Sequence, residues 1–240
     1  MKSIYQQIAR LSCILGLFGL GACSSQSRLP FPDGGKDPHL ALAERVRTSR
    51  RLAVLFIGNS YSFGVPKAFS KIAAEHGKSV RVGHSTFGGW TLARHAEYEP
   101  TLEKIRRGDW DVVVIQEHSE VPAMRPWRRN PKMFPPLRKL VMEARAQGAI
   151  PVLYQTWGRR DGDPKLRGDS FQAMTGRLRE GYRAAAQNAG NLVVVPVGDA
   201  WEREMLAGHG TQLFMPDGSH PTSEGNALTA KAFYQSFYSP

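Results

Sequence analysis

The sequence predicts one α/β domain, built on a parallel sheet of five strands with helices on both faces. Runs such as residues 52–57 are apolar throughout, which is typical of strands buried on both sides. Helical patterns alternate with these runs, and this alternation favours parallel pairing. The 240 residues are 41% hydrophobic, enough for one complete core.

The element order follows from local signals along the chain. Pro66 suits the first turn of a helix, and Gly77, Gly108 and Gly148 each end a helical pattern. A continuous Val-Val-Val-Ile run makes residues 111–116 the strongest β signal. The expected strands are 51–57, 79–84, 111–116, 150–155 and 191–197, and the expected helices are 66–76, 91–107, 131–147, 170–188, 199–206 and 222–237.

The N-terminal segment reads as a secretion signal. Lys2 and Arg10 flank a short apolar stretch over residues 11–20, too short for the roughly 20 residues of a membrane-spanning helix. The sequence Leu-Gly-Ala before Cys23 resembles the lipobox of bacterial lipoproteins. We therefore expect a signal peptide over residues 1–22, lipid on Cys23, a flexible Ser/Pro/Gly tether over 23–40 and the folded domain over 41–240.

This organisation sets the expected location. Cys13 would be removed with the signal, so the mature chain would form no disulfide. Ser24 replaces the aspartate that resembles an inner-membrane retention signal, which favours an outer-membrane lipoprotein facing the periplasm or the cell surface. An ordinary secretion signal, in which Cys23 is incidental, and an uncleaved membrane helix are the alternatives. We expect a monomer.

Positive charge is concentrated in two predicted loops. The formal charge is +11, or +9 once Lys2 and Arg10 are removed. The loops are residues 125–129 after the third strand and residues 157–160 after the fourth, and each pairs arginines with a tryptophan. Arg128 in the first and Trp157 in the second are the candidate ligand contacts. We expect both side chains to bind an acidic or sugar-containing substrate; the alternative is a solvated basic surface near anionic envelope polymers. The sequence contains no recognised nucleic-acid module, so nucleic acid is not an expected partner.

A serine follows the first predicted strand directly. Ser60 stands on the turn into the next helix, whose N-terminal N–H groups can stabilise negative charge. Gly88–Gly89, Gln116, His118 and Trp157 also follow strands, and the carboxyl ends of parallel strands share one edge. Ser60 is thus a candidate nucleophile. It could instead cap the helix, and Ser62 is a weaker competitor.

A candidate base lies before the last helix. His220 follows Asp217 by three residues, so Nδ1–H can donate to the carboxylate while Nε2 points outward. With Ser60, these residues make up a Ser-His-Asp acyl-transfer site. Alone, the segment would read as a surface turn that starts the helix.

Three segments resemble the SGNH (GDSL-type) hydrolases. The segment at Gly58-Asn59-Ser60 is similar to their Gly-Asp-Ser block, Gly88-Gly89-Trp90 to their glycine block, and Asp217 to His220 to their Asp-x-x-His block. The resemblance implies a flavodoxin-like three-layer α/β/α sandwich and a serine nucleophile. It also implies that the N–H groups of Ser60 and either Gly88 or Gly89 (Gly89 preferred) form an oxyanion hole, with no metal or cofactor.

One segment departs from that pattern. Where the family has an asparagine after strand three, this chain has Gln116-Glu117-His118-Ser119, which resembles the Gln-Gly-Glu-Ser motif of sialate O-acetylesterase-like enzymes. A glutamine offers the same carboxamide donors, so we assign Gln116 as third oxyanion donor. The residues expected to face the substrate are Asn59, Trp90, His118, Arg128 and Trp157.

The leading hypothesis is therefore an acetylesterase acting on O-acetylated carbohydrate of the envelope or on imported glycan. A lipase or lysophospholipase, favoured by membrane anchoring, is the rival enzyme. A non-catalytic lipoprotein that binds glycan in the same cleft is the rival from another class.

Overall fold

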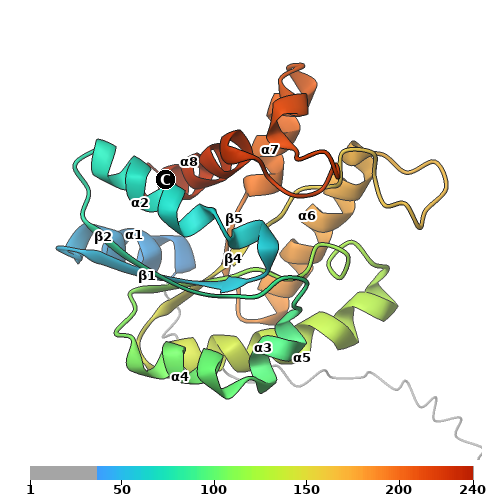
Figure 1. Cartoon of the computed structure of the whole chain (residues 1–240). Helices are drawn as coiled ribbons and strands as arrows, with labels where there is room; N and C mark the ends of the chain where they lie inside the picture. The colour runs from blue at the N-terminus through green and yellow to red at the C-terminus, as the bar shows by residue number, and fades with distance from the viewer. Residues whose placement is uncertain (1–36, 240) are drawn as a thin grey trace, which may run out of the picture. The chain divides into compact units, whose positions relative to one another are not determined.

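The computed structural model describes residues 37–239 and contains a five-stranded sheet in which neighbouring strands are parallel. The strand order is β2-β1-β3-β4-β5, so the direction of winding switches between β1 and β3 (Figure 1). This confirms the predicted fold class. The strands are β1 Leu52–Gly58, β2 Val80–Thr86, β3 Val112–Ile115, β4 Ile150–Tyr154 and β5 Val193–Val195.

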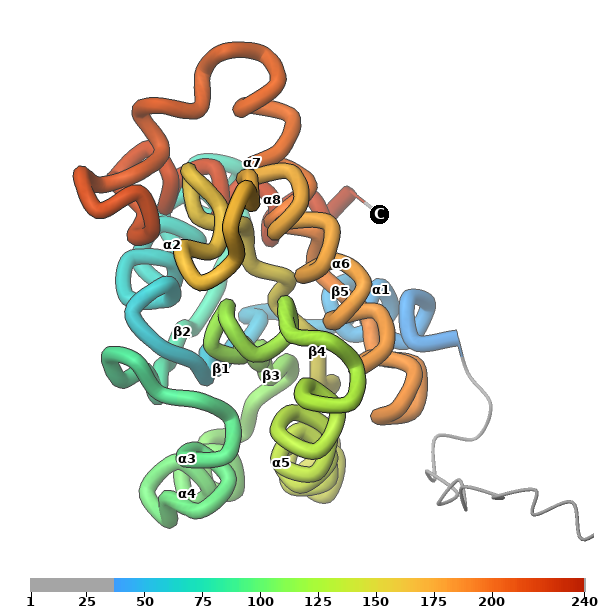
Figure 2. Tube along the Cα trace, turned by 90° about the vertical axis from the view of Figure 1, so that its right-hand side faces the viewer, coloured from blue at the N-terminus to red at the C-terminus, as the bar shows by residue number. Residues whose placement is uncertain are grey.

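Helices cover both faces of the sheet (Figure 1). Helices α2 and α8 pack together with α1 and α7 on one face, while α3, α4 and α5 lie on the other, with α6 beside α5 (Figures 1 and 2). The helices are α1 Pro38–Thr48, α2 Val65–Glu75, α3 Leu92–Glu97, α4 Glu99–Arg107, α5 Pro126–Ala146, α6 Phe171–Asn188, α7 Val197–Leu206 and α8 Ser223–Tyr238.

Aromatic side chains join β1 to α2 and α8. Every residue of β1 is buried, as its apolar run predicts. Phe56 meets Phe69 of α2 and Phe233 of α8 edge to face, at ring-centroid distances of 6.2 and 5.4 Å. Because Ser60 lies shortly before α2 and His220 shortly before α8, this packing also brings the two sequence segments together.

Prolines shift two of the predicted helices. The predicted helix 91–107 is broken at Tyr98, because Pro100 cannot donate the N–H that a continuous helix needs. Helix α5 starts at Pro126 rather than at Pro131, although Pro131, Pro135 and Pro136 lie inside it. Proline suits the first turn of a helix, and Pro126 occupies that position here.

The beginning of the domain also differs from the prediction. Helix α1 starts at Pro38, inside the segment expected to be tether, and Asp37 caps it by accepting the N–H of His39. Leu42 and Val46 anchor this helix in the core. The predicted signal peptide, Cys23 and the tether up to residue 36 lie outside the described residues. Within residues 37–239, no helix is long and apolar enough to cross a membrane.

Candidate active site

Ser60 lies at the switch point of the sheet, where ligands bind in open α/β folds. It follows β1 directly and begins the 3-10 turn Ser60–Ser62, which Asn59 caps by accepting the N–H of Tyr61 at 3.1 Å. Asn59, rather than Ser60, thus caps the turn, and the Ser60 side chain is partly exposed. Its hydroxyl is available for chemistry.

The predicted base meets this hydroxyl. Ser60 Oγ lies 2.9 Å from Nε2 of His220, and Nδ1 of His220 lies 2.5 Å from Oδ2 of Asp217. The other carboxylate oxygen of Asp217 accepts the backbone N–H groups of Ser219 and His220, at 2.9 and 3.0 Å. The three side chains form one hydrogen-bonded chain with the geometry of an acyl-transfer triad.

Asp217 is held as a carboxylate. Partial burial raises the pKa of Asp217, but hydrogen bonds from the His220 ring and from two backbone N–H groups outweigh it and lower the pKa to about 2. The carboxylate is therefore negative at neutral pH and can orient the imidazole.

Three aromatic residues that the sequence did not single out as a group support His220. The rings of Tyr61 and Trp157 stack at 4.7 Å, and those of Trp157 and Trp201 stack at 3.8 Å. Tyr61 also contacts the ring of His220 edge-on, and its hydroxyl lies 2.5 Å from Oγ of Ser219. Trp157 Nε1 donates to the Ser219 carbonyl at 3.1 Å. Adjacency to Ser60 and His220 was the only sequence signal for Tyr61 and Ser219.

The burial of Trp157 contradicts the prediction that this side chain binds substrate. Its side chain is 0% exposed, inside the stack, so it cannot present a face to a sugar. An apolar indole after a strand suits the core as well as a binding surface, and the sequence could not separate the two.

Gln116 is also misassigned as an oxyanion donor. It is fully buried, and its Nε2 donates to Asn59 Oδ1 at 3.1 Å and to the Glu117 carbonyl at 2.7 Å. Its Oε1 accepts the Asn59 N–H and the Ser62 hydroxyl, both at 2.9 Å. Both amide hydrogens are thus engaged, and Gln116 braces the turn from beneath.

Asn59 has the same supporting role. It is buried, its Oδ1 accepts from Tyr61 and Gln116, and its Nδ2 donates to the carbonyl of Trp90 at 3.2 Å. This corrects its assignment to substrate binding. The bond to Trp90 ties the glycine loop to the nucleophile turn.

Backbone donors remain unengaged at this edge. Within the described part of the chain, the N–H groups of Ser60, Gly88 and Gly89 have no hydrogen-bond acceptor. Gly89 is exposed and has a φ of +70°, a conformation that glycine adopts without strain. Backbone N–H groups of this kind can stabilise an oxyanion.

A buried carboxyl joins the loops behind these donors. Glu117 Oε1 accepts the N–H of Leu92 at 3.0 Å and that of His118 at 2.7 Å, while Oε2 has no partner among the described residues. Burial raises the pKa of Glu117 to about 8, against the effect of its two backbone hydrogen bonds. His118 is half-buried in this loop.

Only some of the arginines in the two predicted basic loops are free to contact a ligand. Arg129 is buried and paired with Glu180 at 3.4 Å, whereas Arg128 is exposed and lies over the ring of Trp127 at 5.7 Å. Trp127 is 72% exposed. In the other loop Arg159 pairs with Glu120 at 3.0 Å. Arg128 with Trp127 is therefore the better candidate for ligand contact.

Trp90 packs beside the glycine loop. It is half-buried, 4.2 Å from the ring of Phe87, and the guanidinium of Arg94 lies 5.4 Å from its centroid. This position is compatible with the predicted contact to substrate.

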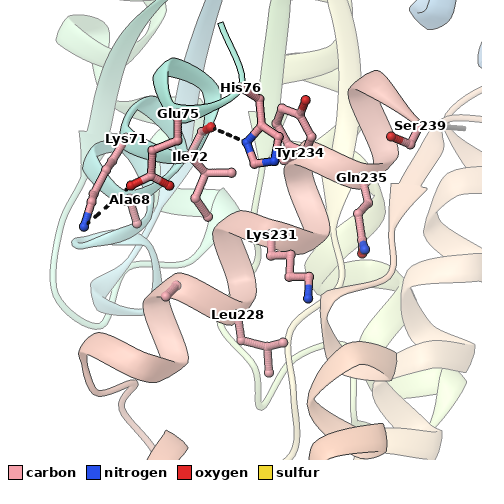
Figure 3. A pocket seen from close by; sticks show the side chains of 11 residues that line it. Ala68, Lys71, Ile72, Glu75, His76, Leu228, Lys231, Tyr234, Gln235 and Ser239 are labelled. Carbon is pink, nitrogen blue, oxygen red and sulfur yellow. Dashed lines mark hydrogen bonds and ion pairs between the residues drawn. The ribbon is translucent and has the colours of Figure 1, made fainter. Parts of the chain in front are cut away.

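A groove of about 700 Å³ lies elsewhere, along α2 and α8 (Figure 3). Ile72, His76, Leu228 and Tyr234 are among its lining residues, and none of the predicted site residues is. Within residues 37–239, no cluster of three or more His, Cys, Asp or Glu side chains could hold a metal ion.

Comparison with known proteins shows which solved structures share this fold. No protein-family model matches the chain, and no curated protein matches it. Several solved structures do match the chain in fold. A DUF4886 family protein from Bacteroides uniformis aligns with a TM-score of 0.69 and 18% identity, over 79% of this chain and 84% of that one.

Two further matches are named hydrolases. A catalytic mutant of Axe2, an acetylxylan esterase from Geobacillus stearothermophilus, aligns with a TM-score of 0.59 and 17% identity, over 78% of this chain and 94% of that one. A lipase/acylhydrolase from Enterococcus faecalis gives 0.56 and 16%, over 77% and 94%. The chain has the SGNH hydrolase fold.

Proposed function

We propose that this protein is a serine ester hydrolase that removes O-acetyl groups from carbohydrate. The observation that carries the proposal is the hydrogen-bonded chain Ser60–His220–Asp217 at the switch point of the sheet. The similarity in fold to an acetylxylan esterase supports the choice of an acetyl ester of a sugar.

The reaction proceeds by two acyl transfers. Ser60 Oγ attacks the ester carbonyl while His220 Nε2 takes its proton, and the tetrahedral oxyanion lies against the N–H groups of Ser60 and Gly89. When the intermediate collapses, the bond to the sugar oxygen breaks and His220 returns the proton to that oxygen. Water then attacks the acyl-serine, with His220 again accepting and returning a proton, which releases acetic acid and restores Ser60.

A lipase-type activity is the second candidate, because two large apolar side chains flank the triad. Phe63, three residues after Ser60, is 57% exposed, and Met215, whose N–H donates to the carbonyl of His220, is 46% exposed. Such side chains could hold a longer acyl chain. Turnover of p-nitrophenyl acetate against p-nitrophenyl decanoate separates the two: a preference for acetate supports deacetylation.

One labelling experiment tests catalysis itself. A fluorophosphonate probe should modify Ser60 in the full chain and in Ser62→Ala, but not in Ser60→Ala. Ser60→Ala should keep its circular dichroism spectrum and lose hydrolysis of p-nitrophenyl acetate. Absence of both labelling and turnover in the parent protein would leave the non-catalytic glycan-binding lipoprotein as the better reading.

We also propose that Cys23 carries lipid and anchors the domain to the outer membrane, facing the periplasm or the cell surface. The lipobox-like Leu-Gly-Ala-Cys sequence supports this, and two or more acyl chains suffice for stable anchoring. Metabolic labelling with an alkyne fatty acid in a bacterial host should mark the parent and not Cys23→Ser. Labelling of that variant would refute the anchor.

A further inference from the structure

The oxyanion site lacks a side-chain donor once Gln116 is assigned to the turn. Its two amide hydrogens are bound to Asn59 and to the carbonyl of Glu117. If a side chain contributes, it must lie at the same edge, reach the surface of the site and carry an uncommitted N–H or O–H. Loss of one such donor commonly lowers kcat a hundredfold or more.

His118 occupies the required place. It follows Gln116 by two residues in the loop after β3, beside the switch point. Its own N–H donates to Glu117 Oε1, which also accepts from Leu92, next to the glycine loop. Its other neighbour, Ser119, lies close enough to Tyr61 to lower the pKa of that hydroxyl, against the larger effect of burial. Both neighbours are buried while His118 is half-buried, so part of His118 reaches the surface at the edge of the sheet where Ser60 also emerges.

The backbone also sets the tautomer of this ring. The N–H of Glu120 points at Nδ1 of His118 at 3.4 Å, so Nδ1 acts as an acceptor. A neutral imidazole with Nδ1 as acceptor carries its proton on Nε2. Burial lowers the pKa of His118, with nearby Glu120 opposing this and Arg159 and Lys165 adding to it, which favours the neutral ring. Within residues 37–239, Nε2 has no hydrogen-bond partner.

From these contacts we propose that His118 Nε2–H is the third oxyanion donor, completing the pair of backbone N–H groups at Ser60 and Gly89. This inference rests on the proposed esterase function. It gives the neutral histidine a task distinct from that of His220: His118 donates a hydrogen bond to the developing negative charge and transfers no proton. Its contribution is made in the transition state, so it acts on kcat rather than on KM.

Steady-state kinetics of the full chain on p-nitrophenyl acetate test the proposal. His118→Phe keeps the ring volume without a donor and should lower kcat about 10²–10³-fold, with KM within threefold of the parent. His118→Gln places an amide N–H at similar reach and should recover at least tenfold of that loss. His84→Phe, at an exposed histidine of β2, is the matched control and should leave both constants unchanged.

Each other result has a definite meaning. A kcat for His118→Phe within threefold of the parent, or a rise in KM alone, overturns the oxyanion assignment and leaves the esterase intact. A parent without turnover or fluorophosphonate labelling overturns both proposals. If His118→Phe does not fold, ¹⁵N NMR of the parent decides: a proton on Nδ1 of His118 at neutral pH refutes the proposal, and a proton on Nε2 supports it.

Discussion

The hydroxyl of Tyr61 lies 2.5 Å from the hydroxyl of Ser219, which links the residue after the nucleophile to the residue before the base. The Tyr61 ring also stacks on Trp157, which in turn stacks on Trp201 in the core. The two catalytic segments, 160 residues apart at Ser60 and His220, are thus held together by their neighbours as well as by their own hydrogen bond.

Removing this hydroxyl should loosen the triad without dismantling it. Tyr61→Phe keeps the stacked ring and loses one hydrogen bond, worth about 1 kcal/mol. We expect kcat to fall about three- to tenfold. A double-mutant cycle with Ser219→Ala checks the cause: the double variant should lose no more than either single variant. Additive losses would show that the two hydroxyls act independently.

Asp217→Asn should separate orientation of the base from its presence. The amide has a single oxygen, so it cannot accept both the backbone N–H groups and the His220 Nδ1–H as the two carboxylate oxygens do, and the imidazole loses its fixed tautomer. We expect kcat to fall on the order of 10³–10⁴-fold. Because the Asp217 side chain is 49% exposed, the melting temperature should change little. A loss of less than tenfold would contradict the role given to Asp217.

Gln116→Leu should act mainly on stability. It leaves the Asn59 N–H and the Ser62 hydroxyl buried without an acceptor, at a cost of about 1–3 kcal/mol for each group. Urea unfolding should show a loss of a few kcal/mol. If kcat instead fell a hundredfold at unchanged stability, Gln116 would be an oxyanion donor after all.

Glu117 should make stability depend on pH. Its pKa is raised to about 8 by burial from an ordinary value of 4.5, so between these values the folded state binds more protons than the unfolded state. Its contribution is therefore fully present below pH 4.5 and is lost as the pH rises toward 8. Glu117→Gln, which keeps the acceptor for two N–H groups, should flatten the slope of unfolding free energy between pH 5 and 8. An unchanged slope would assign the pH dependence to other groups.

Arg128 should contribute to affinity for acidic substrates. It is exposed over Trp127 at the start of α5, which follows β3. Arg128→Gln should raise KM several-fold for an acetylated acidic glycan and leave KM for p-nitrophenyl acetate unchanged. Arg47→Gln, an exposed arginine in α1 before the start of β1, loses the same charge at the other edge and is the control. Equal effects of both variants would indicate general charge attraction only.

The sequence was sufficient for those features that depend on local pattern. The five strands were predicted because buried parallel strands are apolar throughout, as in β1, and the helices alternating with them excluded a purely antiparallel sheet. Ser60 could be placed at the carboxyl edge of the sheet because it follows β1. His220 could be paired with it because the Asp217-to-His220 segment before the last helix resembles the Asp-x-x-His block of SGNH hydrolases. Local rules failed at α5, which begins at Pro126 although the sequence pattern predicted a start at Pro131.

Tertiary structure alone decided the direction in which the polar and aromatic side chains point. Gln116 follows its strand as an oxyanion donor would, yet its amide lies beneath Asn59. Trp157 lies in an apolar stack and not in a binding surface. Sequence position specifies the edge of the sheet at which a residue emerges, whereas its side-chain orientation depends on hydrogen-bond partners and neighbours more than 50 residues away, which no local pattern encodes.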